Sequence, residues 1–194
     1  MDDKYLILAA QLGEDRLKRD VELDQYFSGN PPGQADCLYI ATSERELVHS
    51  VELAQELEIF YKVLGTGSKT DFSKEFFAGL IIKNRYDTMK IFGIKGKVSR
   101  QGIGVEEALV EAGSGASLEK LADFAQKQNL TGLEVLEDLP GTVGGSLLTN
   151  TVLGNFFCQA RILLDGGETE TVDFLPSERN NVIVSVVFKL KAKR

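Results

Sequence analysis

Hydrophobic and polar residues alternate with two different periodicities along this chain, one typical of helices and one typical of strands. Apolar residues recur at the spacing of one helix face in two segments, 44–57 and 118–128. Each segment follows a serine, Ser43 or Ser117, whose hydroxyl can accept a hydrogen bond from the first helical turn. Glu46 then completes the pattern of a capping box with Ser43. We therefore expect one helix in each half of the chain.

Short apolar runs between turn residues predict strands elsewhere. Residues 85–100 alternate polar and apolar positions, as hairpin strands do, and Asp165-Gly166-Gly167 separates two strand-like runs as a hairpin turn does. Residues 1–30, apolar near the start and charged afterwards, predict one or two short helices. Strands outnumber helices in this reading, which indicates an α+β fold. The other expected strands are 37–41, 59–64, 77–83, 108–112, 158–164, 169–174 and 181–190.

The chain has 194 residues, enough for one domain of two lobes or for two small domains. The run Ser28-Gly29-Asn30-Pro31-Pro32-Gly33 breaks regular structure and is a candidate boundary. We expect an N-terminal helical extension over 1–32, a first lobe over 33–100 and a second lobe over 101–194.

Composition narrows the class of protein. A hydrophobic content of 43% and a charged content of 26% are ordinary for a soluble globular protein. The net charge of −7 argues against a nucleic-acid or anionic-membrane partner. No apolar run approaches the roughly 20 residues of a membrane span, and the start Met1-Asp2-Asp3-Lys4 is acidic, unlike that of a signal peptide. We expect a cytoplasmic protein.

Residues for nucleophilic or metal chemistry are scarce. Cys37 and Cys158 are far apart in the sequence, which predicts two half-buried reduced thiols and neither a disulfide framework nor a metal site. The single histidine, His49, falls within a predicted helix and is expected at the surface. No catalytic residue and no metal ligand can be assigned on this basis.

The most distinctive stretch is Leu139–Asn150. Pro140 suits the start of a turn, and the glycines that follow it leave room for a closely approaching ligand. From Thr142 the segment can close into a short helix whose free N–H groups would face an anion or a polarised carbonyl in front of Pro140. The candidate binding residues here are Pro140, Gly141, Thr142, Gly144, Gly145, Ser146 and Asn150.

A second glycine loop follows the predicted strand 59–64. It consists of Gly65, Thr66, Gly67, Ser68 and Lys69. Each loop by itself is also compatible with a plain turn. The two together, one after a strand and one opening a helix, predict a phosphate-bearing cofactor held between two facing loops.

The order of these motifs resembles the FAD-binding part of the UDP-N-acetylenolpyruvoylglucosamine reductase family, which shares the vanillyl-alcohol-oxidase/PCMH type of fold. The resemblance covers roughly residues 33–190. The string Pro140-Gly141-Thr142-Val143-Gly144-Gly145 with the downstream Asn150 is its most specific part. The other matching segments are Gly65–Ser68, Gly79–Ile82, Ala112–Gly115 and Gly132–Glu134.

The resemblance implies FAD as cofactor and a two-lobed FAD-binding domain. The backbone N–H groups of Gly65–Ser68 would hold the pyrophosphate, with Lys69 as an extra cation near it. The residues of the Pro140–Asn150 stretch would lie along the pyrophosphate and the flavin ring. The family reduces an enolpyruvyl sugar nucleotide with NADPH in peptidoglycan synthesis, so NADPH and a UDP-sugar are the implied partners.

Four departures limit what the resemblance implies. Lys69 stands where the family usually has asparagine, and residues 151–155 do not match the family's pattern after Asn150. Arg179 is the nearest candidate for the family's substrate-contacting arginine but lacks its tyrosine neighbour, so it is not assigned that role. The family continues into a third domain with the catalytic serine and glutamate, and nothing here matches those two groups.

Two functions remain open. The first is a flavin-binding oxidoreductase module, either a truncated relative that acts on another substrate or one that cannot turn over alone and needs a partner chain for the substrate domain. The second is a non-catalytic structural or regulatory relative that has lost substrate binding and either keeps or has lost flavin binding. A fragment of a longer protein is a third interpretation.

Overall fold

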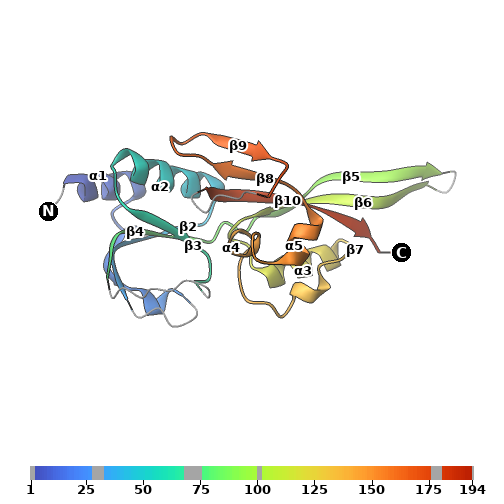
Figure 1. Cartoon of the computed structure of the whole chain (residues 1–194), viewed down its shortest axis with the longest axis horizontal. Helices are drawn as coiled ribbons and strands as arrows, with labels where there is room; N and C mark the ends of the chain where they lie inside the picture. Colours follow the sequence, from blue (N-terminus) through green and yellow to red (C-terminus); the bar gives the residue numbers. More distant parts are fainter. Residues whose placement is uncertain (1–2, 28–32, 68–75, 100–101, 176–180, 194) are drawn as a thin grey trace. The chain divides into compact units, whose positions relative to one another are not determined.

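The computed structural model describes residues 3–27, 33–67, 76–99, 102–175 and 181–193 (Figure 1). Contacts divide the chain into two compact units: unit 1 is Met1–Tyr86 with Leu164–Glu168, and unit 2 is Asp87–Leu163 with Thr169–Arg194. The bounds of these units differ from those of the predicted lobes. That the lobes hold a cofactor between them stays a prediction. Each unit combines helices with one sheet, and the predicted α+β class is confirmed.

Unit 1 is built on a four-stranded sheet in the order β1-β2-β4-β3. Strands β2 and β3 run parallel to β4, and β1 runs antiparallel to β2. Helices α1 and α2 contact each other, and α2 packs against β2 and β4 (Figure 1). The elements are α1 Asp3–Leu12, β1 Lys18–Glu22, η1 Leu23–Gln25, β2 Gln34–Ala41, α2 Glu44–Glu56, β3 Tyr61–Leu64 and β4 Phe76–Asn84.

The expectation of helices only in residues 1–30 is wrong for β1. The segment is charged, but Leu17, Val21 and Leu23 are buried, and β1 pairs in register with β2. One core cluster joins this segment to the sheet: Val21, Leu23, Phe27, Ala35, Leu38, Leu64 and Ile81. Pairing with a strand that comes later in the chain therefore overrode the local pattern.

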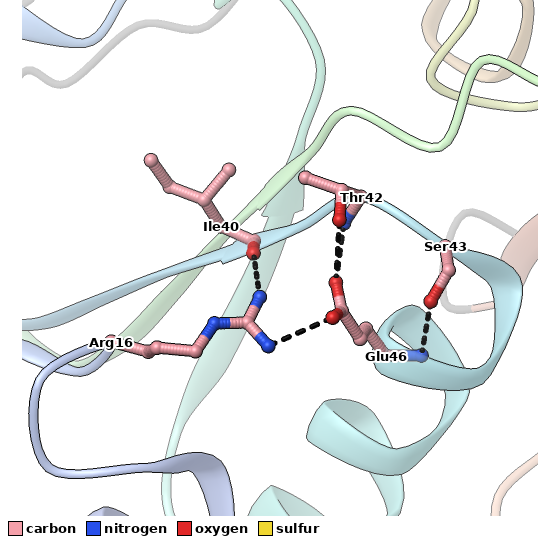
Figure 2. A network of polar contacts seen from close by, with 5 residues as sticks. All are labelled: Arg16, Ile40, Thr42, Ser43 and Glu46. Atoms are coloured by element: carbon pink, nitrogen blue, oxygen red, sulfur yellow. Dashed lines mark hydrogen bonds and ion pairs between the residues drawn. The ribbon is translucent and has the colours of Figure 1, made fainter.

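The start of α2 confirms the predicted cap and adds a contact that the sequence pattern did not suggest (Figure 2). The Ser43 hydroxyl accepts from the Glu46 N–H at 3.3 Å. The Glu46 carboxylate accepts from the N–H and hydroxyl of Thr42, both at 2.8 Å. Arg16 donates to Glu46 at 2.8 Å and to the Ile40 carbonyl at 3.2 Å, so the network ties the segment before β1 to the helix.

Unit 2 is built on a six-stranded sheet in the order β5-β6-β10-β8-β9, with β7 also paired to β10. All its strand pairs are antiparallel. The first residues of β6 pair with β5 alone, so the two strands extend as a ribbon beyond the rest of the sheet (Figure 1). The elements are β5 Met89–Ser99, β6 Gly102–Gly113, α3 Leu118–Lys127, β7 Leu130–Thr131, η2 Glu134–Leu136, α4 Val143–Ser146, α5 Thr151–Phe156, β8 Phe157–Leu163, β9 Thr169–Val172 and β10 Val182–Ala192.

The histidine and the two cysteines have ordinary structural surroundings. His49 is exposed on α2, as predicted, and Cys37 and Cys158 are free, with Cys37 fully buried. Burial raises the pKa of the Cys37 thiol to about 11. Over the described ranges, the helices are too short or too polar to cross a membrane, and no group of three or more His, Cys, Asp or Glu side chains is arranged to hold a metal ion.

Candidate functional site

The first glycine loop directly follows β3, an edge strand of the unit 1 sheet. Gly65, Thr66 and Gly67 are partly exposed, and Ser68 and Lys69 lie outside the described residues. Gly67 has φ +76°, and a Cβ there would lie 2.8 Å from the Cβ of Phe27. Both the backbone conformation and the packing therefore require glycine at 67. Within the described part of the chain, the N–H groups of Gly65 and Gly67 donate to no protein acceptor.

The second glycine loop packs across the corner between β6 and α3 in unit 2. The Leu118 N–H donates to the Gly141 carbonyl at 3.2 Å, and Val143 donates to Ala116 at 2.9 Å. These bonds form an isolated antiparallel bridge between Ser117 and Thr142. The loop is thus held by backbone pairing rather than by its own side chains.

The expected short helix is present as α4, but its N–H groups are not free. Val143 donates to Ala116, Gly144 donates to the Ser114 carbonyl at 2.9 Å, and Gly145 donates to the Thr142 hydroxyl at 3.3 Å. The prediction that these N–H groups face a ligand is therefore wrong. The carbonyls of Ser114 and Ala116, in the corner before α3, accept from two of these N–H groups. Because α4 has 4 residues, few other N–H groups belong to its first turn.

The glycines of this loop serve the protein's own packing more than the sequence suggested. A Cβ on Gly144 would lie 2.9 Å from the Cβ of Ser114, and a Cβ on Gly141 would lie 2.6 Å from the Ser146 hydroxyl oxygen. Gly145 is exposed, and its nearest neighbour would be the Thr142 hydroxyl at 3.2 Å. Of the three glycines, Gly145 is the most exposed.

The donors that remain in this loop precede α4. Over the described ranges, the N–H groups of Gly141 and Thr142 donate to no protein acceptor, although both residues are buried. Pro140, beside them, is exposed. A buried donor without a partner costs about 1–3 kcal/mol, so this position favours an acceptor that comes from outside the protein.

Asn150 has a structural role that the sequence pattern did not reveal. Its side-chain oxygen accepts from the N–H groups of Val152, at 2.9 Å, and Leu153, at 3.3 Å, and so caps α5. Among the described residues, its amide nitrogen has no protein acceptor. Ser146 is 1% exposed and packs under Gly141.

One cation near the first loop was missed. Lys83, at the end of β4, lies in register with Leu64, the residue before Gly65. Burial, and then the nearby Arg85, lower the pKa of its ammonium group. The available signal was a lysine that directly follows the apolar run Leu80-Ile81-Ile82. Arg179, the family's substrate-arginine candidate, lies outside the described residues.

These sites were compared with known proteins. The sequence profile of the FAD binding domain family matches residues 35–172. The chain belongs to this family. FAD is therefore its cofactor, as predicted.

Relatives of this FAD-binding domain include reductases named for UDP-N-acetylenolpyruvoylglucosamine. The chain is 33% identical over 135 residues to such a reductase, numbered 2, of Symbiobacterium thermophilum, covering 70% of this chain and 40% of the relative. It is 26% identical over 204 aligned positions to the reductase of Geobacillus thermodenitrificans, covering 96% of this chain and 62% of the relative. The chain thus spans 40% and 62% of the length of these two relatives, and the resemblance to the flavin-binding part is confirmed.

Solved structures show the same fold. The UDP-N-acetylenolpyruvylglucosamine reductase of Thermus caldophilus matches with a TM-score of 0.64 at 21% identity, over 92% of this chain and 64% of that one. p-Cresol methylhydroxylase matches with a TM-score of 0.59 at 14% identity, over 100% of this chain and 44% of that one. The predicted vanillyl-alcohol-oxidase/PCMH type of fold is confirmed.

The described residues of each loop fit the phosphates of FAD. Among the described residues, the N–H groups of Gly65 and Gly67 have no protein acceptor, and those of Gly141 and Thr142 lack one beside the exposed Pro140. Backbone donors of this kind bind anions without needing net positive charge, which suits a chain of net charge −7.

Proposed function

We propose that this chain is the flavin-holding part of a reductase that uses NADPH to reduce an enolpyruvyl sugar nucleotide, as the names of its relatives suggest for the substrate. In this proposal both glycine loops contact one FAD, with residues 65–69 and the 140–146 loop around the pyrophosphate. The observation that carries it is that each loop has two backbone N–H groups, those of Gly65 and Gly67 and those of Gly141 and Thr142, without a protein acceptor in the described part of the chain.

The chain's own residues bind and orient the cofactor in this proposal. The N–H groups of Gly65, Gly67, Gly141 and Thr142 would hold anionic oxygens, and the exposed Gly145 leaves room for close approach. When bound, FAD supplies hydride chemistry. Donors fixed in the backbone need no reorganisation when charge develops, which is the advantage of preorganised sites.

Turnover needs a general acid, and no residue of this chain has been assigned that role. Reduction of an enolpyruvyl double bond leaves a carbanion that requires a positioned acid. No residue of the chain was matched to the family's serine or glutamate. We therefore propose that the acid and the UDP-sugar site come from outside the flavin-binding region, either on a partner chain or in another part of the same protein.

A non-catalytic relative is the second candidate. It is favoured by the internal pairing of the α4 N–H groups and by the protein atoms that fill the space beside Gly141 and Gly144. Under this interpretation the loop keeps its shape for structural or regulatory reasons, and NADPH has no flavin to reduce.

Uptake of FAD by the purified chain separates these candidates. We expect added FAD to remain with the protein through gel filtration, with the visible absorbance of bound flavin, and anaerobic NADPH to bleach it. A chain that retains no FAD supports the non-catalytic relative. Retained FAD that NADPH leaves oxidised supports a passive carrier.

Gly145→Asp tests the second loop. An aspartate suits the first turn of a helix, so the variant should fold, but its charge would repel the phosphates. We expect FAD affinity to fall at least tenfold, or about 1.4 kcal/mol. The control is Gly166→Asp, at an exposed turn where a Cβ would meet nothing within 4 Å. Equal affinity in wild type and Gly145→Asp would show that the loop does not contact the cofactor.

A further inference from the structure

Lys83 is a half-buried cation whose charge no carboxylate of the described residues compensates. Its Nζ donates to the Tyr26 carbonyl and lies 5.0 Å from the centroid of the Phe27 ring. Both partners are neutral, so they hold the ammonium in place without cancelling its charge. Among the residues that the structure describes, no carboxylate pairs with it, and the positive charge of the nearby Arg85 acts on it as well.

Phe27 connects this cation to the first glycine loop. A Cβ on Gly67 would lie 2.8 Å from the Cβ of Phe27 and 2.9 Å from its ring, so the loop rests directly on this side chain. The same ring carries the Lys83 ammonium. Leu64, the register partner of Lys83, continues into Gly65. Strand pairing and one aromatic ring thus bring the cation next to the loop.

We propose that Lys83 is the cation of the phosphate-binding loop and pairs with the pyrophosphate of FAD; this assignment rests on the proposed function. The phosphates carry negative charge, and a partly desolvated cation attracts them more strongly than an exposed one does. In this arrangement the N–H groups of Gly65 and Gly67 fix the position of the pyrophosphate, and the Lys83 ammonium neutralises part of its charge. From the sequence, Lys69 was the cation expected near the pyrophosphate, and it lies outside the described residues.

Lys18 provides a matched control. Its Nζ lies 5.6 Å from the Tyr26 ring centroid, so it makes the same kind of cation–aromatic contact. It is exposed and belongs to β1, the edge strand opposite β3 in the sheet order β1-β2-β4-β3. Removing its charge changes the net charge of the protein equally but leaves the loop untouched.

The experiment compares binding of FAD and of riboflavin, which lacks both phosphates, by fluorescence titration of the full chain. We expect Lys83→Met to raise the Kd for FAD about tenfold, the scale of one charge-assisted contact, and to leave the Kd for riboflavin within about twofold. Lys83→Arg should keep the affinity for FAD within about threefold, because the charge is retained. Lys18→Met should match wild type for both ligands.

The outcomes are distinguishable. If wild type takes up no FAD, the proposed function fails and the Lys83 assignment fails with it. If wild type binds FAD and Lys83→Met binds it equally well, or weakens FAD and riboflavin alike, the function stands and the Lys83 assignment is overturned. An equal loss in Lys18→Met would also overturn it, because the effect would then follow net charge.

A measurement on wild type keeps the test independent of variant folding. Reductive methylation followed by peptide mass spectrometry reports the accessibility of each lysine. We expect FAD to lower methylation of Lys83 at least fivefold, as expected for an ammonium that becomes paired with phosphate, and riboflavin to leave it unchanged. Methylation of Lys18 should be the same with and without FAD. Equal methylation of Lys83 with and without FAD would exclude the proposed contact.

Discussion

Single glycines in this protein are required by neighbouring atoms as much as by any ligand. Gly79 has φ +153°, and a Cβ there would lie 2.1 Å from the Phe60 carbonyl oxygen. That oxygen accepts from the Leu80 N–H at 2.8 Å, at the point where β3 and β4 begin to pair. Because β3 leads into Gly65, the glycine at 79 helps to position the first loop.

Gly79→Ala should therefore be strongly destabilising. The clash is with backbone, which cannot move aside, and we expect a loss of about 3 kcal/mol or more in the free energy of unfolding. Gly166→Ala is the control, because it also has positive φ but a Cβ would meet nothing within 4 Å. Its cost should be about 1–2 kcal/mol from the backbone conformation alone. Urea unfolding measures both, and similar losses would contradict the steric account.

Helix α2 depends on a cap that reaches beyond the local sequence. Glu46 accepts from Thr42 and pairs with Arg16, which belongs to the segment before β1 (Figure 2). The hydrogen bond from Arg16, aided by those from Thr42, lowers the pKa of Glu46 from 4.5 to about 2. The folded state therefore favours the ionised carboxylate.

The lowered pKa of Glu46 predicts how the stability of the protein changes with pH. The contribution of Glu46 is complete above its ordinary value of 4.5 and is lost as the pH falls toward about 2. Its side chain is 26% exposed and that of Arg16 44%, so solvent screening reduces the gain. We expect Glu46→Gln to cost about 1–2 kcal/mol at neutral pH and to flatten the pH dependence in that window.

Urea midpoints at several pH values test this prediction. Glu58→Gln is the control, because Glu58 is 87% exposed in its pair with Lys4, and its stability should stay near that of wild type. A Glu46→Gln curve parallel to that of wild type from neutral to acid pH would show that the Arg16 contact contributes no net stability.

The two units each carry one glycine loop, residues 65–67 in unit 1 and 140–146 in unit 2. In the proposed function one FAD contacts both. Binding to the folded state alone stabilises it by about 2.7 kcal/mol when the ligand is at 100 times its Kd. A ligand that engages both loops should stabilise both units together.

Amide hydrogen exchange tests this joint contact. We expect FAD to slow exchange at least tenfold at Gly65 and Gly67 and also at Gly141 and Thr142, because each N–H would gain an acceptor. Exchange in the β5–β6 ribbon should change little and serves as the control. Protection confined to one loop would show that a single unit holds the cofactor.

Much of the fold follows from local pattern. Helix α2 begins after Ser43 and α3 after Ser117, as their caps predicted, and the alternating residues 85–100 contain β5, which pairs in a hairpin with β6. Caps, turns and periodicity act between residues close in sequence, so they can be read without the structure. The glycine motifs likewise identified the family correctly.

The remaining features depend on residues that are distant along the chain. β1 forms a strand because it pairs with β2. The N–H groups of Val143 and Gly144 in α4 donate to carbonyls of the corner before α3. Lys83 lies next to Gly67 because Phe27 contacts both. The sequence alone singled out the two glycine loops as candidate binding loops. Which of their N–H groups lack a protein acceptor was decided by tertiary packing, because burial and hydrogen-bond pairing depend on neighbours that folding brings together.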